Sequence, residues 1–112
     1  MNNRTTRRGP ENCNSMSELR DEIDLLDRDL VALIAERARY IDRAIVLKTR
    51  DGLPAYIPER VEEVVDHVRE VAREFDAPEQ IVETIWRVMV DQFISIESGH
   101  LAGSALAADP PR

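Results

Sequence analysis

The chain has 112 residues, of which 15 are basic and 22 acidic, giving a net charge of −7 at pH 7. Such a chain fits one domain, and its acidity excludes a general surface for nucleic acid or anionic membranes. Cys13 is the single cysteine, which excludes an internal disulfide framework or zinc site. No apolar run reaches the ~18 residues of a membrane span, and no signal peptide is apparent, so we expect a cytoplasmic protein.

Residues 1–14 are polar and aperiodic, and we expect them to form a disordered leader. Arg4, Arg7 and Arg8 could make this leader a basic arm, but a solvated tail is the preferred interpretation in so acidic a chain.

A long helix is predicted to follow the leader. Ser15 and Glu18 have the spacing of a capping box, and a turn with Gly52 and Pro54 predicts that the helix ends near residues 49–52. Its apolar positions alternate by four and three residues, as in the seam of a coiled coil. The seam consists of Leu19, Ile23, Leu26, Leu30, Leu33, Arg37, Tyr40, Ala44 and Leu47.

This helix is too long for a core built by one chain. About 30 residues span roughly 45 Å, whereas a compact domain of about 100 residues has a radius of gyration of only ~13 Å. The seam therefore needs a partner, and a second copy of the chain is the simplest one.

Two further helices are predicted. Pro58 is placed to begin the second, in which apolar residues recur at helical spacing up to Phe75. Asp76 is expected to cap the third helix, which should stop near Gly99. The fold class is thus all-α, with a three-helix domain over residues 15–101 and a flexible tail over residues 102–112.

Two cations on the first helix are candidate ligands for an anion. Arg37 lies in the apolar seam, and Lys48 follows 11 residues later, which returns to within about 20° of the same face. The two residues lie roughly 16 Å apart along the axis, so their long side chains could hold a small dicarboxylate between them. For Arg37 alone, an ion pair or a snorkelling side chain explains the position equally well.

Three other residues are weaker candidates. Arg20 points about 100° away from Arg37, so it can serve such a pocket only in a partner copy. Arg60, in the first turn of the second helix, is by position alone an exposed arginine. Glu97 lies in an apolar stretch, where it is either protonated and donates a hydrogen bond or is ionised and paired with Arg or Lys.

Other kinds of chemistry find no support in the sequence. His67 and His100 are expected at the surface. No set of His, Asp or Glu has metal-ligand spacing, and no phosphate loop or nucleophile triad is apparent.

Five segments together resemble the all-helical class of chorismate mutases. They are LRDEIDLLD at 19–27, LIAER at 33–37, Lys48, PERV at 58–61 and FISIE at 93–97. The resemblance implies an intertwined homodimer that rearranges chorismate to prephenate without metal or cofactor. It also implies that Arg37 and Lys48 bind the carboxylates of the substrate, that Lys48 and Glu97 reach its ether oxygen, that Arg60 joins the site, and that Arg20 crosses into the site of the partner.

The chain departs from that family at two positions. Ile57 and Val61 stand where many members carry acids that hold the ring bearing the hydroxyl group. The segment around them is similar to the isochorismate pyruvate lyase branch, and a branch acting on 4-amino-4-deoxychorismate is similar too. These alternatives stay open at this point, as does a non-catalytic helical dimerisation module.

Overall fold

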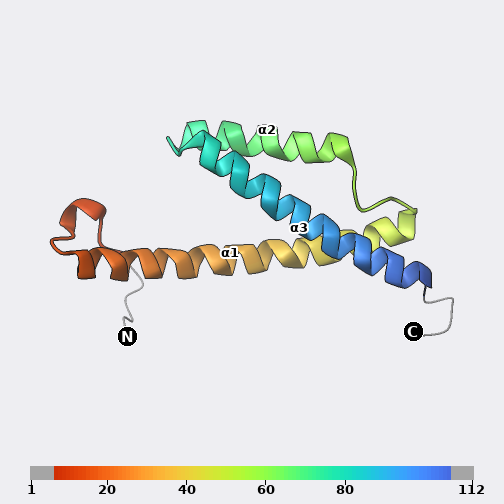
Figure 1. Ribbon diagram of the computed structural model, residues 1–112, viewed down its shortest axis with the longest axis horizontal. Coiled ribbons are helices and arrows are strands. Elements are labelled where there is room, and N and C mark those ends of the chain that lie inside the picture. The colour runs from red at the N-terminus through yellow and green to blue at the C-terminus, as the bar shows by residue number, and fades with distance from the viewer. Residues whose placement is uncertain (1–6, 107–112) are drawn as a thin grey trace. The chain divides into compact units, whose positions relative to one another are not determined.

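The computed structural model describes residues 7–106, and the side chains of residues 7–99. A short 3-10 helix, η1 (Pro10–Asn12), is followed by three α-helices, and the described residues contain no strand. The helices are α1 (Met16–Asp51), α2 (Pro58–Glu74) and α3 (Glu79–Leu106), shown in Figure 1. The predicted all-α fold with a long first helix is confirmed.

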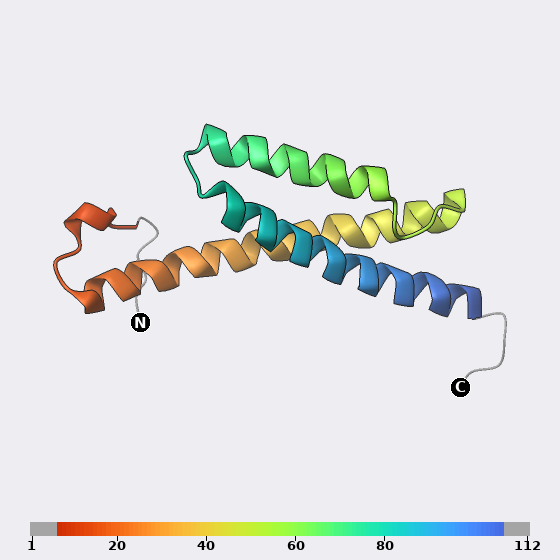
Figure 2. The same ribbon diagram turned by 45° about the horizontal axis from the view of Figure 1, so that its top comes forward.

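The chain divides into two compact units, Met1–Tyr40 and Ile41–Arg112. The first unit contains η1 and the larger part of α1. The second contains the last turns of α1 together with α2 and α3, which run side by side as a hairpin in both views (Figures 1 and 2).

The long helix begins and ends as its sequence predicts. At its start, the amide of Glu18 donates to Oγ of Ser15 at 3.1 Å, and Oε1 of Glu18 accepts the amide of Asn14 at 2.8 Å. At its end, Gly52 has a φ of 69°, a left-handed conformation that suits glycine. The amide of Leu53 then donates back to the carbonyl of Lys48 at 2.8 Å, which closes a Schellman motif.

The core of the second unit is small and aliphatic. The apolar face of α2 buries Val65, Val68 and Ala72, and α3 contributes Val90. Val65 is the most completely buried, with 1% of its surface exposed. The valine spacing predicted for α2 therefore corresponds to its packing face.

Two predicted helix boundaries are wrong. Asp76 does not cap α3, because it has a φ of 54° and terminates α2 instead. The amide of Ala77 donates to the carbonyl of Ala72 at 2.7 Å, which is a second Schellman motif with Asp in the position usually taken by glycine. At the other end, α3 does not stop at Gly99 but continues to Leu106, since one helical glycine costs only ~1 kcal/mol relative to alanine.

The ends of the chain test the two terminal predictions only in small part. Residues 1–6 of the expected leader and 107–112 of the expected tail lie outside the described residues, as does the side chain of His100. Residues 7–14 include η1 and contact α1, and the disorder of the leader as a whole stays an untested prediction.

Candidate active site

Lys48 is fixed in place by the turn that ends α1. Its carbonyl receives the amide of Leu53, and the turn then directs residues 53–57 back over the end of the helix. Ala55 is buried in this loop, and its carbonyl accepts a hydrogen bond from Nζ of Lys48 at 2.9 Å. The backbone and the side chain of Lys48 therefore both hold the loop that separates α1 from α2.

The ammonium group of Lys48 also reaches α3, where it meets Glu97. Nζ of Lys48 lies 2.7 Å from Oε2 of Glu97, and the two side chains are only 19% and 5% exposed. Of the two interpretations of Glu97, the structure thus shows the one in which the carboxylate is paired with a cation. This pair joins residues 49 positions apart within the second unit.

The pair has the properties of a site for an anionic or polar ligand. A charge-assisted hydrogen bond is stronger when it is sheltered from solvent, because the charges are then screened less. A lysine ammonium has three N–H donors, and Ala55 and Glu97 accept two of them, which leaves one donor for a ligand. A sheltered cation with a donor to spare can stabilise negative charge that develops on a bound molecule.

Arg60 lies in the first turn of α2 but is not drawn to this pair. Its guanidinium lies 3.6 Å from the carboxylate of Glu63, and its side chain is 67% exposed. The structure thus places Arg60 at the surface, as its position alone suggests, and its role in a substrate site stays a prediction.

The two remaining candidates belong to the first unit. Arg37 is half-buried, and its Nη1 atom is shielded from solvent. Arg20, near the start of α1, is exposed. The pairing of Arg37 with Lys48 around one ligand stays a prediction.

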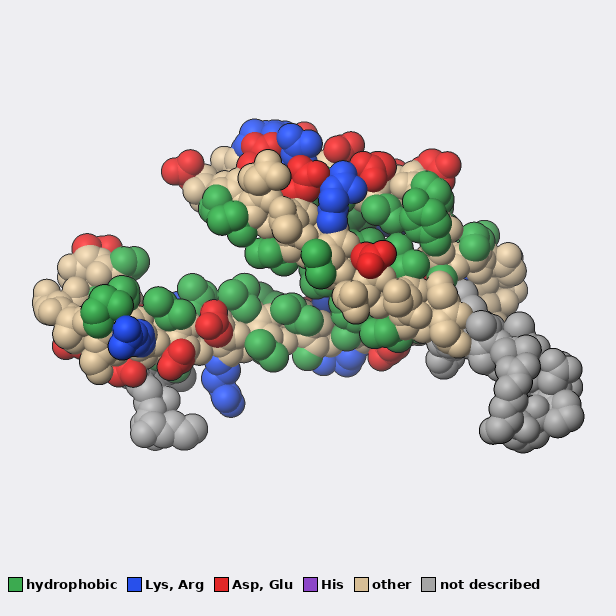
Figure 3. All heavy atoms as spheres, viewed as in Figure 1, with side chains coloured by type: hydrophobic (Ala, Val, Ile, Leu, Met, Phe, Trp, Pro, Cys, Tyr) green, Lys and Arg blue, Asp and Glu red, His purple; other side chains and the backbone are tan. Residues whose placement is uncertain are grey.

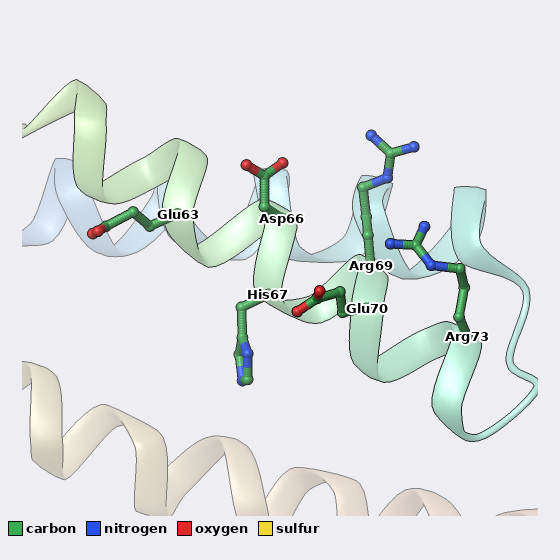
Figure 4. A pocket seen from close by; sticks show the side chains of 6 residues that line it. All are labelled: Glu63, Asp66, His67, Arg69, Glu70 and Arg73. Atoms are coloured by element: carbon green, nitrogen blue, oxygen red, sulfur yellow. The ribbon is translucent and has the colours of Figure 1, made fainter.

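The outer face of α2 carries a hollow that is not a convincing site. Figure 4 shows that its side chains point in different directions, with Asp66 and His67 on opposite sides of the helix. Its lining residues are Glu63, Asp66, His67, Arg69, Glu70 and Arg73. Arg69 and Arg73 are already paired with acids of α3, because both guanidiniums bind Glu79, at 3.0 and 2.6 Å, and that of Arg69 also lies 3.5 Å from Glu83.

The described residues contain neither a metal-binding cluster nor a membrane-spanning helix. No group of three or more His, Cys, Asp and Glu residues between residues 7 and 106 is placed to hold a metal ion. No helix in the same part of the chain is both long and apolar enough to cross a membrane.

Two features of the structure had no clear signal in the sequence. The carbonyl of Ala55 belongs to the backbone, so residue type could not reveal its bond to Lys48. Glu22 is buried, with 6% of its surface exposed, because residues 7–14 fold back against it. The repeated acids on one face of α1 were the available sign that a basic segment packs there.

Comparison with known proteins places this geometry in context. A family model described as chorismate mutase type II matches residues 19–98, which confirms the resemblance seen in the sequence. The chain is 27% identical over 86 residues to the chorismate mutase of Methanocaldococcus jannaschii, with 77% of this chain and 87% of that protein covered.

Two longer proteins are also similar. The T-protein of Enterobacter agglomerans is 33% identical over 81 residues, which cover 71% of this chain and 22% of that protein. The bifunctional chorismate mutase/prephenate dehydratase of Aquifex aeolicus is 29% identical over 85 residues, with coverages of 73% and 24%. The chain thus spans about a quarter of the length of these two relatives. No solved structure matches it.

Proposed function

The chain belongs to the type II chorismate mutase family, and we propose that it rearranges chorismate to prephenate in a pocket built around Lys48 and Glu97. The observation that carries this proposal is the sheltered contact of 2.7 Å between Nζ of Lys48 and Oε2 of Glu97. Both residues occupy positions that the resemblance assigns to the ether oxygen of the substrate.

The reaction suits a site made of cations and hydrogen-bond donors. It is a pericyclic rearrangement in which a C–O bond breaks while a C–C bond forms, so no group leaves and no nucleophile, metal or redox cofactor is needed. The protein must hold a compact conformer of a dicarboxylate, and such positioning can contribute several kcal/mol to the lowering of the barrier. Arg37 and Lys48, with Arg60 and the Arg20 of a partner subunit, would supply the positive charge that binds the two carboxylates.

Charge development on the ether oxygen gives Lys48 and Glu97 their proposed catalytic role. As the C–O bond breaks, that oxygen becomes more negative, and preorganised donors stabilise it most in the transition state. Lys48 offers the N–H that Ala55 and Glu97 do not take. Glu97 can donate as well when its carboxyl carries a proton, while its second oxygen keeps the bond to Lys48.

A homodimer completes the proposed site. Seam residues of α1 that a globular chain would bury are exposed here, including Leu30 at 50%, Leu33 at 60% and Tyr40 at 71%. Figure 3 shows hydrophobic side chains on the visible, N-terminal part of this helix. Monomeric proteins rarely expose such contiguous apolar surface, and a second α1 would cover it.

The test is a product assay in which the protein is incubated with chorismate and with isochorismate in parallel. Prephenate from chorismate supports the proposal, and Arg37→Ala should abolish turnover while leaving helicity and the oligomeric state unchanged. Isochorismate is included because Ile57 and Val61 are apolar where many family members carry acids. Salicylate and pyruvate from isochorismate, with no turnover of chorismate, would show that the chain is a lyase instead.

The role of Glu97 has its own test. A glutamine at this position keeps an N–H donor at every pH, whereas the glutamate donates only while it is protonated. Glu97→Gln should therefore keep much of the wild-type kcat, whereas Glu97→Ala, which removes the donor, should lower kcat ~10²–10³-fold. If the alanine and glutamine variants have the same kcat, Glu97 is not a hydrogen-bond donor in the reaction.

A further inference from the structure

The segment that precedes α1 folds back along the first turns of that helix. We call residues 7–14, which include η1, the arm. The amide of Arg8 donates to Oε1 of Glu22 at 2.6 Å, and the guanidinium of Arg8 lies 3.4 Å from Glu18. Arg7 forms an ion pair with Asp29, about two turns further along α1. The arm is thus held by three acidic residues of α1, the first and last of which are 11 positions apart in the sequence.

The three acids that hold the arm share one face of α1. Glu18 and Glu22 are four residues apart and Glu22 and Asp29 seven, so each step returns to within about 40° of the same direction. Arg20 is two residues from both Glu18 and Glu22, a rotation of about 200°. The arm therefore packs on the side of the helix opposite Arg20, which stays exposed.

The arm supplies contacts where α1 otherwise has few. At this end of the helix the seam residues Ile23 and Leu26 are 46% and 40% exposed, and the first turns of a helix fray unless they are held. Glu22, in contrast, is only 6% exposed. A carboxylate that is buried and accepts a backbone amide makes a strong local anchor, because leaving either group without its partner is costly.

We propose that the arm is a positioning element for Arg20, with Glu22 as its anchor. The arm contacts the first turns of α1 on the face opposite Arg20 and restrains the backbone that carries this residue. The guanidinium of Arg20 is thereby positioned for the substrate pocket of the partner copy. This inference rests on the proposed function, in which Arg20 binds a carboxylate across the dimer. Glu22 itself touches no substrate and acts through Arg20.

The main test is Glu22→Met in the full-length protein. Methionine favours helix and fills similar space but cannot accept the amide of Arg8, so the arm should be released. We expect the KM for chorismate to rise roughly tenfold with kcat little changed, since a binding residue is less well placed. Amide hydrogen exchange should become faster in residues 16–24 and stay unchanged in α2 and α3. Unchanged exchange in residues 16–24 would overturn the proposal.

Three control variants separate this role from a general loss of stability. Glu22→Gln keeps an oxygen that accepts the amide and should retain most of the affinity. Arg8→Ala keeps the backbone donor and should also stay close to the wild-type KM. Glu70→Met makes the same replacement at an exposed position of α2 and should change neither KM nor exchange.

A double mutant decides whether Glu22 acts through Arg20. In an Arg20→Ala background, Glu22→Met should add no further increase in KM, because the two changes remove one function. An equal increase in both backgrounds would overturn the proposal while leaving the function of the protein intact. A wild-type protein that does not turn over chorismate would overturn the proposed function, and this inference with it.

Discussion

The two units of the chain use the same kind of amphipathic helix in opposite ways. In the second unit the apolar face of α2 is buried within the chain, and Val65, Val68 and Ala72 are 1%, 8% and 3% exposed. In the first unit the seam of α1 has the same regular spacing, yet Leu30 and Leu33 are 50% and 60% exposed. One face is covered by residues of its own unit, whereas the other is exposed among the described residues of its unit.

This difference assigns different tasks to the two regions. The hairpin of α2 and α3 carries Glu97 and holds it against Lys48, so half of the proposed site is assembled by a single chain. The exposed seam carries Arg37, and the same stretch of α1 carries Arg20, the cation that in the proposed site reaches the pocket of a second chain. A variant in either region should therefore fail in a recognisable way.

Lys48→Ala should, like Arg37→Ala, have the largest effect on the reaction. It removes the ammonium donor of the second unit, and the loss of one hydrogen-bond donor to the transition state typically lowers the rate ~10²–10³-fold. The seam is untouched, so light scattering should find the same oligomer as for the wild type while kcat falls. A variant that keeps a tenth or more of the wild-type kcat would remove Lys48 from the chemistry.

Leu30→Lys should weaken the seam of the first unit and leave the hairpin of α2 and α3 intact. A lysine in the middle of the seam places a charge in a face that needs an apolar partner, and we expect dimerisation to weaken at least ~tenfold. Sedimentation at several concentrations measures this change, and turnover should fall with the fraction of dimer. Val31→Lys is the matched control, because Val31 is 64% exposed and lies outside the seam. Equal dimerisation by both variants would refute the seam as the interface.

The sequence predicted the helices well because their signals are local. Helical spacing, the Ser15–Glu18 cap and Pro58 act within one or two turns, and all of them are confirmed. The left-handed backbone conformation of Asp76 could not be predicted in the same way. It depends on how α2 ends, whereas the sequence signal was interpreted as the start of α3.

The sequence predicted side chains of the candidate site but not its backbone contacts. Lys48 and Glu97 were found by residue type and spacing, and the structure brings them together. The carbonyl of Ala55 and the burial of Glu22 arise from the path of the backbone, which leaves no mark on residue type. Arg60, selected by the same resemblance, lies at the surface beside Glu63.

Val65→Ala should moderately lower the stability of the fold and test whether the core of the second unit lies within one chain. Val65 is 1% exposed, and removing buried methyl groups from such a core costs about 1–3 kcal/mol. Because this core lies within one chain, the decrease in Tm relative to the wild type should be the same at low and high protein concentration. Val31→Ala, at an exposed position of α1, should change Tm very little. A decrease that varies with concentration would place Val65 in the interface between copies.

Arg87→Gln should have the smallest effect and is visible mainly through its pH dependence. Arg87 joins α3 to α2 through two contacts of 3.2 Å with Glu62, and it also binds Glu83 at 2.9 Å. The hydrogen bond and charge of Arg87 hold the pKa of Glu62 below its ordinary value of 4.5. A lowered carboxyl pKa stabilises the folded state at pH values above that ordinary pKa, and the contribution is lost as pH falls through the folded-state pKa.

The difference in Tm between wild type and Arg87→Gln should therefore be small at pH 7, because the pair is exposed to solvent, and should vanish in acid. A difference that persists unchanged in acid would show that Arg87 stabilises the hairpin by packing rather than by charge.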